Sequence, residues 1–339
     1  MGDLRTVVGF LSQPASYPDA PAGVECVETH LSWVFLTDRY AFKLKKPVHD
    51  EFVDLRDIEA RRLRCEEELR LNRRLSPDVY LGTVAVRSDG RGGLTMGDSG
   101  VAVDWLVWMR RLPANRMLDA IILSRSFDGS MLVPVIGLLC GLYRRSVVPL
   151  AADVHRGQLA EIVSGNQIDL SRPEFALPTP IVDRLCSEQL RFLDRRPLFE
   201  ERARALRIVE GHGDLRPEHV CLEARPAIID ALDFSAKLRT LDAADELGFL
   251  ALECERLGAP DARSRIFLEY ARETGDHPPE SLVHFYQSLR ATVRARLAIR
   301  HLRDPTVRDR ERWPAVAKRY LELADLHLGQ CARHPAPGA

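Results

Sequence analysis

The segment at residues 212–219, His-Gly-Asp-Leu-Arg-Pro-Glu-His, constrains the fold of this chain more than any other feature. Its glycine and Asp214 interrupt the helical pattern that precedes them. Two short apolar runs follow at 220–222 and 227–229, and the Glu-Ala-Arg-Pro between them indicates a hairpin. Asp230 ends the second run, so one hairpin separates it from Asp214. The sequence therefore predicts two carboxylates, one in a loop and one at the end of a buried strand.

Short strands dominate the first third of the chain, and helices dominate the rest. Segments with the residue types and lengths of strands lie at 24–29, 33–37, 40–45, 79–86 and 101–109. One helix lies among them, from a cap at Asp54 or Asp57 to about Leu75. Helices are then predicted at 132–145, 150–164, 181–195 and 198–206, with three or four more between 241 and 332. This order lacks the βαβ alternation of a doubly wound sheet, so we expect an α+β fold.

Composition argues against several classes of function. The net charge is −1, which gives no basic field for nucleic acid. The seven cysteines are scattered without a CxxC pair, which argues against a zinc knuckle or disulfide framework and fits a reducing cytoplasm. We find no signal-peptide pattern, no apolar run long enough to span a membrane and no GxxxxGK[ST] phosphate loop. We therefore expect a cytoplasmic protein that binds neither nucleic acid nor membrane; its oligomeric state is not predicted.

Lysine is scarce and concentrated in one place. Of 48 basic residues only five are lysine, and three of these lie within the strand-like segment and its end, at 43, 45 and 46. Lysine offers a compact point charge, whereas arginine offers a planar fork. Because side chains two apart share a face of a strand, Lys43 and Lys45 should point the same way.

Taken together, the motif at 212–219 and the Ile-Ile-Asp at 228–230 resemble the aminoglycoside phosphotransferase-like kinases, a protein-kinase-like family. Segments similar to a bacterial subfamily of this group lie at 28–35, 42–47, 67–75 and 109–111, and the resemblance covers residues 24–257. It implies a protein-kinase-like two-lobed fold, with a small antiparallel-sheet N-lobe carrying one helix and a larger, mainly helical C-lobe. The expected divisions are an N-lobe at 24–108, a hinge at 109–113 and a C-lobe at 114–334. Residues 1–23, with prolines at 14, 18 and 21 and few periodic apolar residues, are expected to form a short helix and a linker.

The resemblance implies roles for individual residues. Asp214 matches the catalytic-loop carboxylate, and Asp230 matches the magnesium ligand. Lys43 matches the lysine that contacts the nucleotide phosphates, with Lys45 as its rival. His219 stands where the family has asparagine as a metal ligand. An imidazole suits a hard cation less well than oxygen does, so manganese is an alternative to magnesium.

Further roles are implied around the nucleotide. A glutamate of the helix after the lysines should pair with one of them; the run 66–68 offers three, of which Glu67 is favoured. The turn at 29–32 would cover the nucleotide phosphates, and Ser32 is its candidate contact although the turn lacks glycine. Met109 lies where the backbone of the hinge would meet the adenine. Asp233, in Asp-Phe-Ser, is a second candidate for the metal-binding aspartate, but Asp230 is favoured because the apolar run at 227–229 makes a better buried strand ending in it.

The implied activity is that of a kinase. It would transfer the γ-phosphoryl group of ATP or GTP to a hydroxyl of a small molecule with the help of a divalent metal. The alternative is a nucleotide-binding pseudokinase that acts as a regulatory module, because His219 replaces a metal ligand. Three acidic residues that could attract a polycation such as an aminoglycoside are Glu246, Glu253 and Glu255. The substrate and the choice of ATP or GTP stay open.

Overall fold

The computed structural model describes residues 4–49, 53–303, 307 and 309–333. The chain forms two compact units that interleave along the sequence. Unit 1 comprises Met1–Ile121 and Glu218–Leu238, and unit 2 comprises Ile122–Pro217 and Arg239–Ala339. The first has mainly strands and the second mainly helices, which confirms the predicted α+β class. The predicted lobe and hinge boundaries remain predictions.

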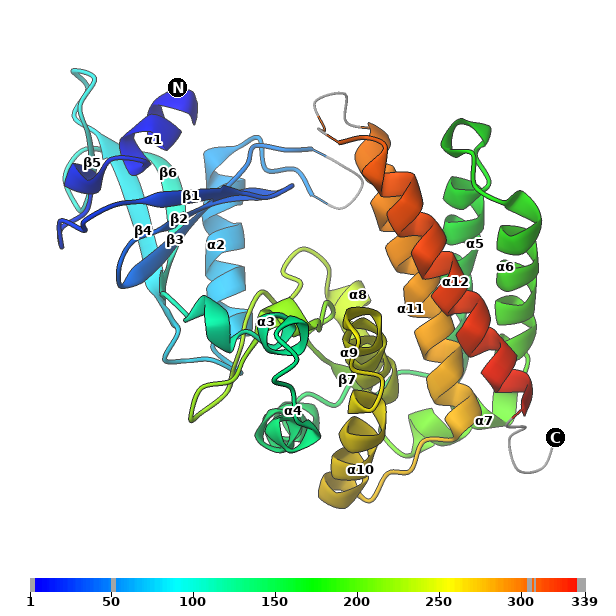
Figure 1. The fold of residues 1–339 in the computed structure, drawn as a ribbon. Helices are drawn as coiled ribbons and strands as arrows, with labels where there is room; N and C mark the ends of the chain where they lie inside the picture. The colour runs from blue at the N-terminus through cyan, green and yellow to red at the C-terminus, as the bar shows by residue number, and fades with distance from the viewer. Residues whose placement is uncertain (1–3, 50–52, 304–306, 308, 334–339) are drawn as a thin grey trace. The chain divides into compact units, whose positions relative to one another are not determined.

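Unit 1 is built on one six-stranded antiparallel sheet with the order β1-β2-β3-β6-β4-β5 (Figure 1). The strands are β1 (Glu25–Glu28), β2 (Ser32–Leu36), β3 (Tyr40–Lys45), β4 (Tyr80–Ser88), β5 (Leu94–Met96) and β6 (Val101–Arg110). The five strands expected from the sequence are present. The additional strand, β5, was missed because three residues beside a glycine-rich turn are too few to show an alternating pattern.

The two faces of this sheet have different apolar partners. Phe42 and Leu44 of β3 pack in one buried cluster with Val7 and Leu11 of α1 (Leu4–Leu11). Ala41, on the other face of β3, packs in a second cluster with residues of α2 (Ile58–Asn72), β4 and β6. This split follows from the period of two in a strand. Lys43 and Lys45 have the same parity as Ala41 and lie on the α2 face.

Helix α2 begins where the sequence indicated. Asp57 is its N-cap, and its side chain accepts a hydrogen bond from the Glu59 amide at 2.8 Å. Arg61 forms a bidentate pair with Asp104 of β6 at 2.9 and 3.0 Å, and both side chains are buried. The pair fixes one side of α2 against the sheet.

Unit 1 also contains the predicted hairpin. It is formed by β8 (Val220–Cys221) and β9 (Ala227–Ile228), which pair antiparallel. Cys221 and Ala227 join the cluster that contains Ala41, so the hairpin packs on the α2 side of the sheet core. The short helix α8 (Ala236–Arg239) follows it.

Unit 2 is mainly helical. Its helices are α4 (Val133–Arg145), α5 (Ala152–Leu170), α6 (Thr179–Leu193), α7 (Arg196–Arg204), α9 (Ala243–Leu257), α10 (Ala262–Thr274), α11 (Glu280–Arg300) and α12 (Arg312–Arg333). A short helix, α3 (Leu118–Leu123), precedes them and begins in unit 1. The helices α11 and α12 lie side by side along much of their length (Figure 1). The sequence located these helices but not α3, which has fewer than two turns.

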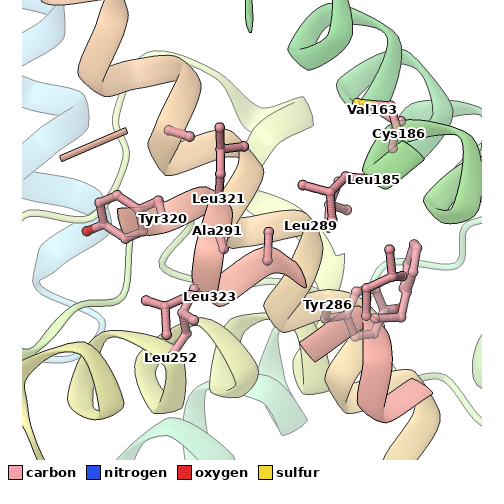
Figure 2. Close-up of a cluster of buried hydrophobic side chains, with 14 of the residues drawn as sticks. Val163, Leu185, Cys186, Leu252, Tyr286, Leu289, Ala291, Tyr320, Leu321 and Leu323 are labelled. Atoms are coloured by element: carbon pink, nitrogen blue, oxygen red, sulfur yellow. The ribbon is translucent and has the colours of Figure 1, made fainter. Parts of the chain in front are cut away.

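The core of unit 2 lies among α5, α6, α9, α11 and α12. Figure 2 shows side chains from these helices converging, among them Leu185, Leu252, Leu289 and Leu321. Two aromatic rings stack within the core, Phe192 and Phe285, with centroids 4.4 Å apart. Within the part of the chain that the structure describes, no helix is long and apolar enough to cross a membrane.

Unit 2 also contains a pair of short strands that the sequence did not predict. Strand β7 (Ile208–Glu210) pairs antiparallel with β10 (Thr240–Asp242). Each is very short, so neither carries a period that sequence can reveal. Their pairing matters because β7 leads directly into the segment that begins at Gly211, and β10 leads into α9.

Candidate functional site

Two lysines and one buried glutamate form the centre of a charged network in unit 1. Lys43 and Lys45 both point from β3 toward α2, where Glu68 lies with a side chain only 1% exposed. The Lys43 Nζ is 3.0 Å from Glu68 Oε1, and the Lys45 Nζ is 2.5 Å from Oε2. One carboxylate therefore binds two ammonium groups, one through each oxygen.

Each lysine also binds an aspartate that follows the hairpin. The Lys43 Nζ lies 2.5 Å from Asp230 Oδ1, and the Lys45 Nζ lies 2.6 Å from Asp233 Oδ2. Both aspartates considered in the sequence thus enter the network, each through its own lysine. The Asp233 side chain is 12% exposed, whereas that of Asp230 is 47% exposed. Asp230 is the more accessible of the two carboxylates.

The network keeps its members charged. Burial alone would raise the pKa of the Glu68 carboxyl, but Lys43 and Lys45 lower it below its ordinary value. Burial likewise opposes ionisation of Asp230, and Lys43 together with His219 drives its pKa far below the usual range. Burial lowers the pKa of Lys43, yet Asp230 and Glu68 raise it well above the ordinary lysine value.

Asp230 has a strained backbone that its surroundings hold in place. Its φ is +62°, in the left-handed region that residues other than glycine seldom occupy. Its amide donates to Tyr80 Oη at 3.0 Å, and the next amide, of Ala231, donates to Asn72 Oδ1 at 2.9 Å. Ser76 accepts from the Ile228 amide and donates to the carbonyl of the same residue. Strain of this kind persists where neighbouring contacts fix the conformation, and it is common at functional sites.

His219 lies beside Asp230. Its Nε2 is 3.7 Å from Asp230 Oδ2, and its backbone carbonyl accepts from the Ile229 amide at 2.9 Å. Two ligands of one ion bound at about 2.1 Å are separated by roughly 3 to 4 Å, so the pair can share a cation. Within the described ranges, no three His, Cys, Asp or Glu side chains gather closely enough to hold a metal by themselves. The pair fits magnesium, which typically takes few protein ligands and completes its shell with phosphate and water.

The prediction that Glu67 pairs with a lysine is wrong, because Glu68 has that position. Glu67 binds Arg70 on its own helix at 2.7 and 2.8 Å, and Glu66 pairs with Arg62. Each helical residue is rotated by about 100° from the last, so only one of three consecutive glutamates can face the sheet. Cys65, one helical turn before Glu68, is fully buried, and this spacing marks the inner face of α2.

Two other predicted nucleotide contacts are placed as follows. Ser32 is 2% exposed at the start of β2 and lies opposite Lys45 in the sheet. Met109 lies in β6 opposite Ala41, with a side chain that is largely buried. A nucleotide role for either residue stays a prediction.

In unit 2, the loop that carries Asp214 is held by a glutamate on α9. The Glu246 Oε1 accepts hydrogen bonds from the His212 and Gly213 amides at 2.8 and 2.7 Å. Its Oε2 accepts from Tyr143 Oη at 2.8 Å. Glu246 is 1% exposed, and burial raises the pKa of its carboxyl although these hydrogen bonds act in the other direction. The sequence did not reveal this supporting position, because nothing in the local pattern of Glu246 separates it from a surface acid.

Glycine is required at two positions of this loop. A Cβ atom on Gly211 would lie 2.6 and 2.7 Å from the two carboxylate oxygens of Glu246. Gly213 has φ of +86°, which other residues rarely adopt. The loop also supports itself, since the Asp214 amide donates to His212 Nδ1 at 3.3 Å. These contacts account for the two glycines and give the His212 ring a structural role in the loop.

The Asp214 carboxylate is partly exposed, at 28%, and forms an ion pair with Arg216 at 3.0 Å. Two acids at the start of α9 form ion pairs with arginines. Asp242 caps the helix and binds Arg202 at 2.7 and 2.8 Å, and Asp245 binds Arg290 through both of its oxygens.

The suggestion that acids of α9 attract a polycation is not supported for two of the three residues named. Glu246 holds the loop described above, and Glu253 is fully buried, where it binds Tyr320 and Arg256. Glu255 is partly exposed and lies 3.0 Å from His327 Nε2. Burial of the first two removes them from contact with a ligand.

Comparisons with known proteins support the fold. An uncharacterized protein of Mycobacterium tuberculosis is 32% identical over 338 residues, which cover 93% of this chain and 63% of the relative. The chain thus spans less than two thirds of that relative's length. A choline/ethanolamine kinase family protein from Mesorhizobium loti aligns with a TM-score of 0.61 at 15% identity, over 97% of both chains. The ethanolamine kinase of Plasmodium vivax aligns with a TM-score of 0.50 at 8% identity, over 89% of this chain and 81% of that one. No protein-family model matches the chain.

The chain therefore has the protein-kinase-like fold that the sequence predicted. At this level of identity, the solved structures show the fold alone, and function has to be argued from the residues of the site.

Proposed function

We propose that this protein is a kinase-like phosphotransferase that moves the γ-phosphoryl group of ATP or GTP to a hydroxyl of a small molecule. The observation that carries the proposal is the network of Lys43, Glu68 and Asp230. It supplies an ionised lysine and an accessible, ionised carboxylate on adjacent elements of unit 1. Phosphoryl transfer uses these two groups to bind the phosphates and their metal.

In this proposal, Lys43 binds the nucleotide phosphates and Glu68 holds it in position. The Glu68 carboxylate is buried and bound on both oxygens, so it gives Lys43 a fixed anchor. Lys45 is less exposed than Lys43, at 6% against 15%, and it is bound between Glu68 and Asp233. This difference favours Lys43 as the phosphate ligand and gives Lys45 a positioning role.

Asp230 and His219 would hold the divalent metal. The metal, when bound, neutralises charge on the phosphates during transfer. Asp230 contributes a permanently ionised carboxylate, one oxygen of which binds Lys43 while the other faces His219. The chain's own part is to keep this carboxylate charged and aimed by a strained backbone.

Asp214 would orient the acceptor hydroxyl and accept its proton. A carboxylate in this role must be accessible and held in one geometry. Asp214 is partly exposed, and its loop is fixed through the two amides that bind Glu246. Arg216 orients the carboxylate itself.

The test is turnover of γ-labelled ATP and GTP by the purified protein with magnesium and with manganese, beside Asp214→Asn and Asp230→Asn. Turnover depends on groups that bear charge, so we expect each variant to lose it by a factor of roughly 100 or more. Asp230→Asn should also weaken metal-dependent nucleotide binding, whereas Asp214→Asn should not. Glu67→Gln, which changes a partly exposed residue of α2, is the matched control and should behave as the wild type.

Other results would change the interpretation. Nucleotide binding that depends on Asp230, without turnover in the wild type, would favour the pseudokinase. Absence of both binding and turnover would contradict the site.

A further inference from the structure

Two buried histidines of unit 2 face each other where α11 packs along α12 (Figure 1). His284 lies in the second turn of α11, and His327 lies in the last two turns of α12. Their side chains are 8% and 4% exposed. The Nδ1 atoms of the two rings are 3.0 Å apart, so each ring presents the same nitrogen to the other. Neither residue has a role in the proposed phosphoryl transfer.

The opposite nitrogen of each ring faces a carboxylate. His327 Nε2 lies 3.0 Å from Glu255 Oε2 on α9, and His284 Nε2 lies 3.8 Å from Glu280 Oε2 at the start of α11. Glu280 also forms an ion pair with Arg263 of α10. A carboxylate fixes the hydrogen of a neutral imidazole on the nitrogen that faces it, which favours the Nε2–H tautomer of both rings.

With hydrogen on both Nε2 atoms, the two Nδ1 atoms present lone pairs to each other. Lone pairs 3.0 Å apart repel, so this arrangement calls for a cation between the rings. The cation is either a proton that the two nitrogens share or a metal ion. Two nitrogens that bind one ion at 2.0–2.1 Å in a tetrahedral shell are about 3.3 Å apart. The observed separation therefore suits a metal with little movement of either ring.

Buried polar atoms on both sides of His284 distinguish the two cations. Gln287 is fully buried one turn after it, and Ser281 is 1% exposed one turn before it. Among the described residues, the Gln287 amide oxygen and nitrogen and the Ser281 hydroxyl lack a hydrogen-bond partner. A Cβ atom on Gly248 would lie 3.6 Å from Gln287 Cγ and 3.8 Å from the Val283 carbonyl oxygen. The glutamine side chain thus runs back along α11 toward the turn of His284, as helical side chains usually do.

These atoms need a partner that a shared proton cannot supply. Buried polar groups in native proteins are nearly always hydrogen-bonded, and a bound ion with its water is one source of partners. The Gln287 oxygen can ligate a metal, and the Ser281 hydroxyl can bind water on that metal. Within the described ranges, no three His, Cys, Asp or Glu side chains gather around one ion. The rest of the shell around a metal at the two rings must therefore be amide and water.

We propose that His284 and His327 bind a divalent transition-metal ion through their Nδ1 atoms, with Gln287 and water completing its shell. Imidazole suits ions of the zinc, nickel and copper class, whereas magnesium prefers oxygen. Glu255 and Glu280 hold the rings from behind, as carboxylates commonly do for metal-bound histidines. Because the two histidines lie on different helices, the ion fastens α12 to α11 and stabilises unit 2. The site does not depend on the phosphotransferase function.

The first experiment titrates Zn²⁺ calorimetrically into the purified full chain, for wild type, His284→Gln and His327→Gln. Excess Mg²⁺ is present to compete for Asp230 and His219. Removing a ligand should weaken binding at this site by roughly 100-fold or more, since even changes behind a ligand cost up to that factor. His277→Gln, which removes an exposed histidine of unit 2, is the matched control and should bind Zn²⁺ as the wild type.

The second experiment changes the support and keeps both rings. Glu255→Gln removes the carboxylate behind His327 and should weaken Zn²⁺ binding by roughly 10- to 100-fold. Thermal unfolding of each protein is then followed with Zn²⁺ and with a chelator. Zn²⁺ should raise the unfolding midpoint of the wild type, because it binds the folded state, and should leave that of the two histidine variants unchanged.

Unchanged Zn²⁺ binding in both histidine variants, or no Zn²⁺ binding by the wild type, overturns the proposal. In the second case, a wild type whose stability falls as pH rises, and falls less in the histidine variants, identifies the cation between the rings as a shared proton. Circular dichroism establishes that the variants are folded. If a histidine variant is not folded, Glu255→Gln decides the question, because Zn²⁺ affinity equal to that of the wild type contradicts the site.

Discussion

The two carboxylates that the sequence places on either side of the hairpin are held by opposite means. In unit 1, Asp230 is fixed by charge, through Lys43 and the buried Glu68. In unit 2, the loop of Asp214 is fixed by neutral donors, because backbone amides and a tyrosine hydroxyl converge on Glu246. A buried glutamate is central to both arrangements, yet cations surround the first and dipoles surround the second. The comparison shows that the partners of a buried glutamate decide the direction of its pKa shift: charged lysines lower the pKa of Glu68, whereas burial among neutral donors raises that of Glu246.

The largest expected effect comes from removing the charged anchor. Glu68→Ala leaves two buried lysines with less compensation, and breaking a buried ion pair in this way costs about 3 to 5 kcal/mol. We expect the free energy of unfolding from urea titration to fall by this amount. Glu67→Ala is the matched control on the same helix, and its effect should stay within about 0.5 kcal/mol. Equal losses in both variants would show that the network does not stabilise unit 1.

Removing the glutamate that binds neutral donors should cost somewhat less. Glu246→Ala deprives the His212 and Gly213 amides and the Tyr143 hydroxyl of their acceptor, at about 1 to 3 kcal/mol for each group left buried and unpaired. Relaxation and water entry should reduce the total to about 2 to 4 kcal/mol. Glu246→Gln keeps an acceptor oxygen for the amides and should retain most of the stability and of any turnover. If the glutamine variant loses as much as the alanine variant, the charge of Glu246 is what holds the loop.

A change to the loop itself should have a smaller effect. Gly211→Ala places a methyl group against the Glu246 carboxylate, closer than van der Waals contact allows, and overpacking of this kind costs about 1 to 3 kcal/mol. Because the Glu246 carboxylate that holds the Asp214 loop must shift, we expect turnover to fall by a larger factor than the loss of folding free energy alone would cause. Gly329→Ala, on α12 where a Cβ would have open space, is the control and should be neutral or slightly stabilising.

The dependence of stability on pH should have opposite signs for the two glutamates. The folded pKa of Glu68 lies below its unfolded value, so its contribution is present above the unfolded pKa and is lost as pH falls through the folded pKa. The folded pKa of Glu246 is raised, so its contribution is present below the unfolded pKa and is lost as pH rises through the folded pKa. Urea titrations from acidic to slightly alkaline pH should therefore show a steeper rise with pH in Glu246→Gln than in the wild type. In Glu68→Gln the rise should be shallower.

The order of elements in the fold followed from the sequence because periodic apolar residues dominate its long segments. The strands around Lys43, the helix capped by Asp57 and the hairpin before Asp230 all lie where the pattern placed them. The strands and α-helices that were missed, β5, α3, β7, α8 and β10, are all short. Pairing of β7 with β10 joins segments that the Asp214 loop and the hairpin separate in the sequence, and no local signal records that contact.

For the site, the sequence by itself determined the two carboxylates, their spacing and the shared face of Lys43 and Lys45, because motifs and strand period are local properties. Tertiary structure alone decided that Glu68 and not Glu67 meets the lysines, since the rotation of α2 against the sheet selects the partner. It also decided that Glu246 is an internal anchor and not a surface acid. The physical reason is the same in both cases: a carboxylate's role depends on which donors reach it, and those donors come from distant parts of the chain.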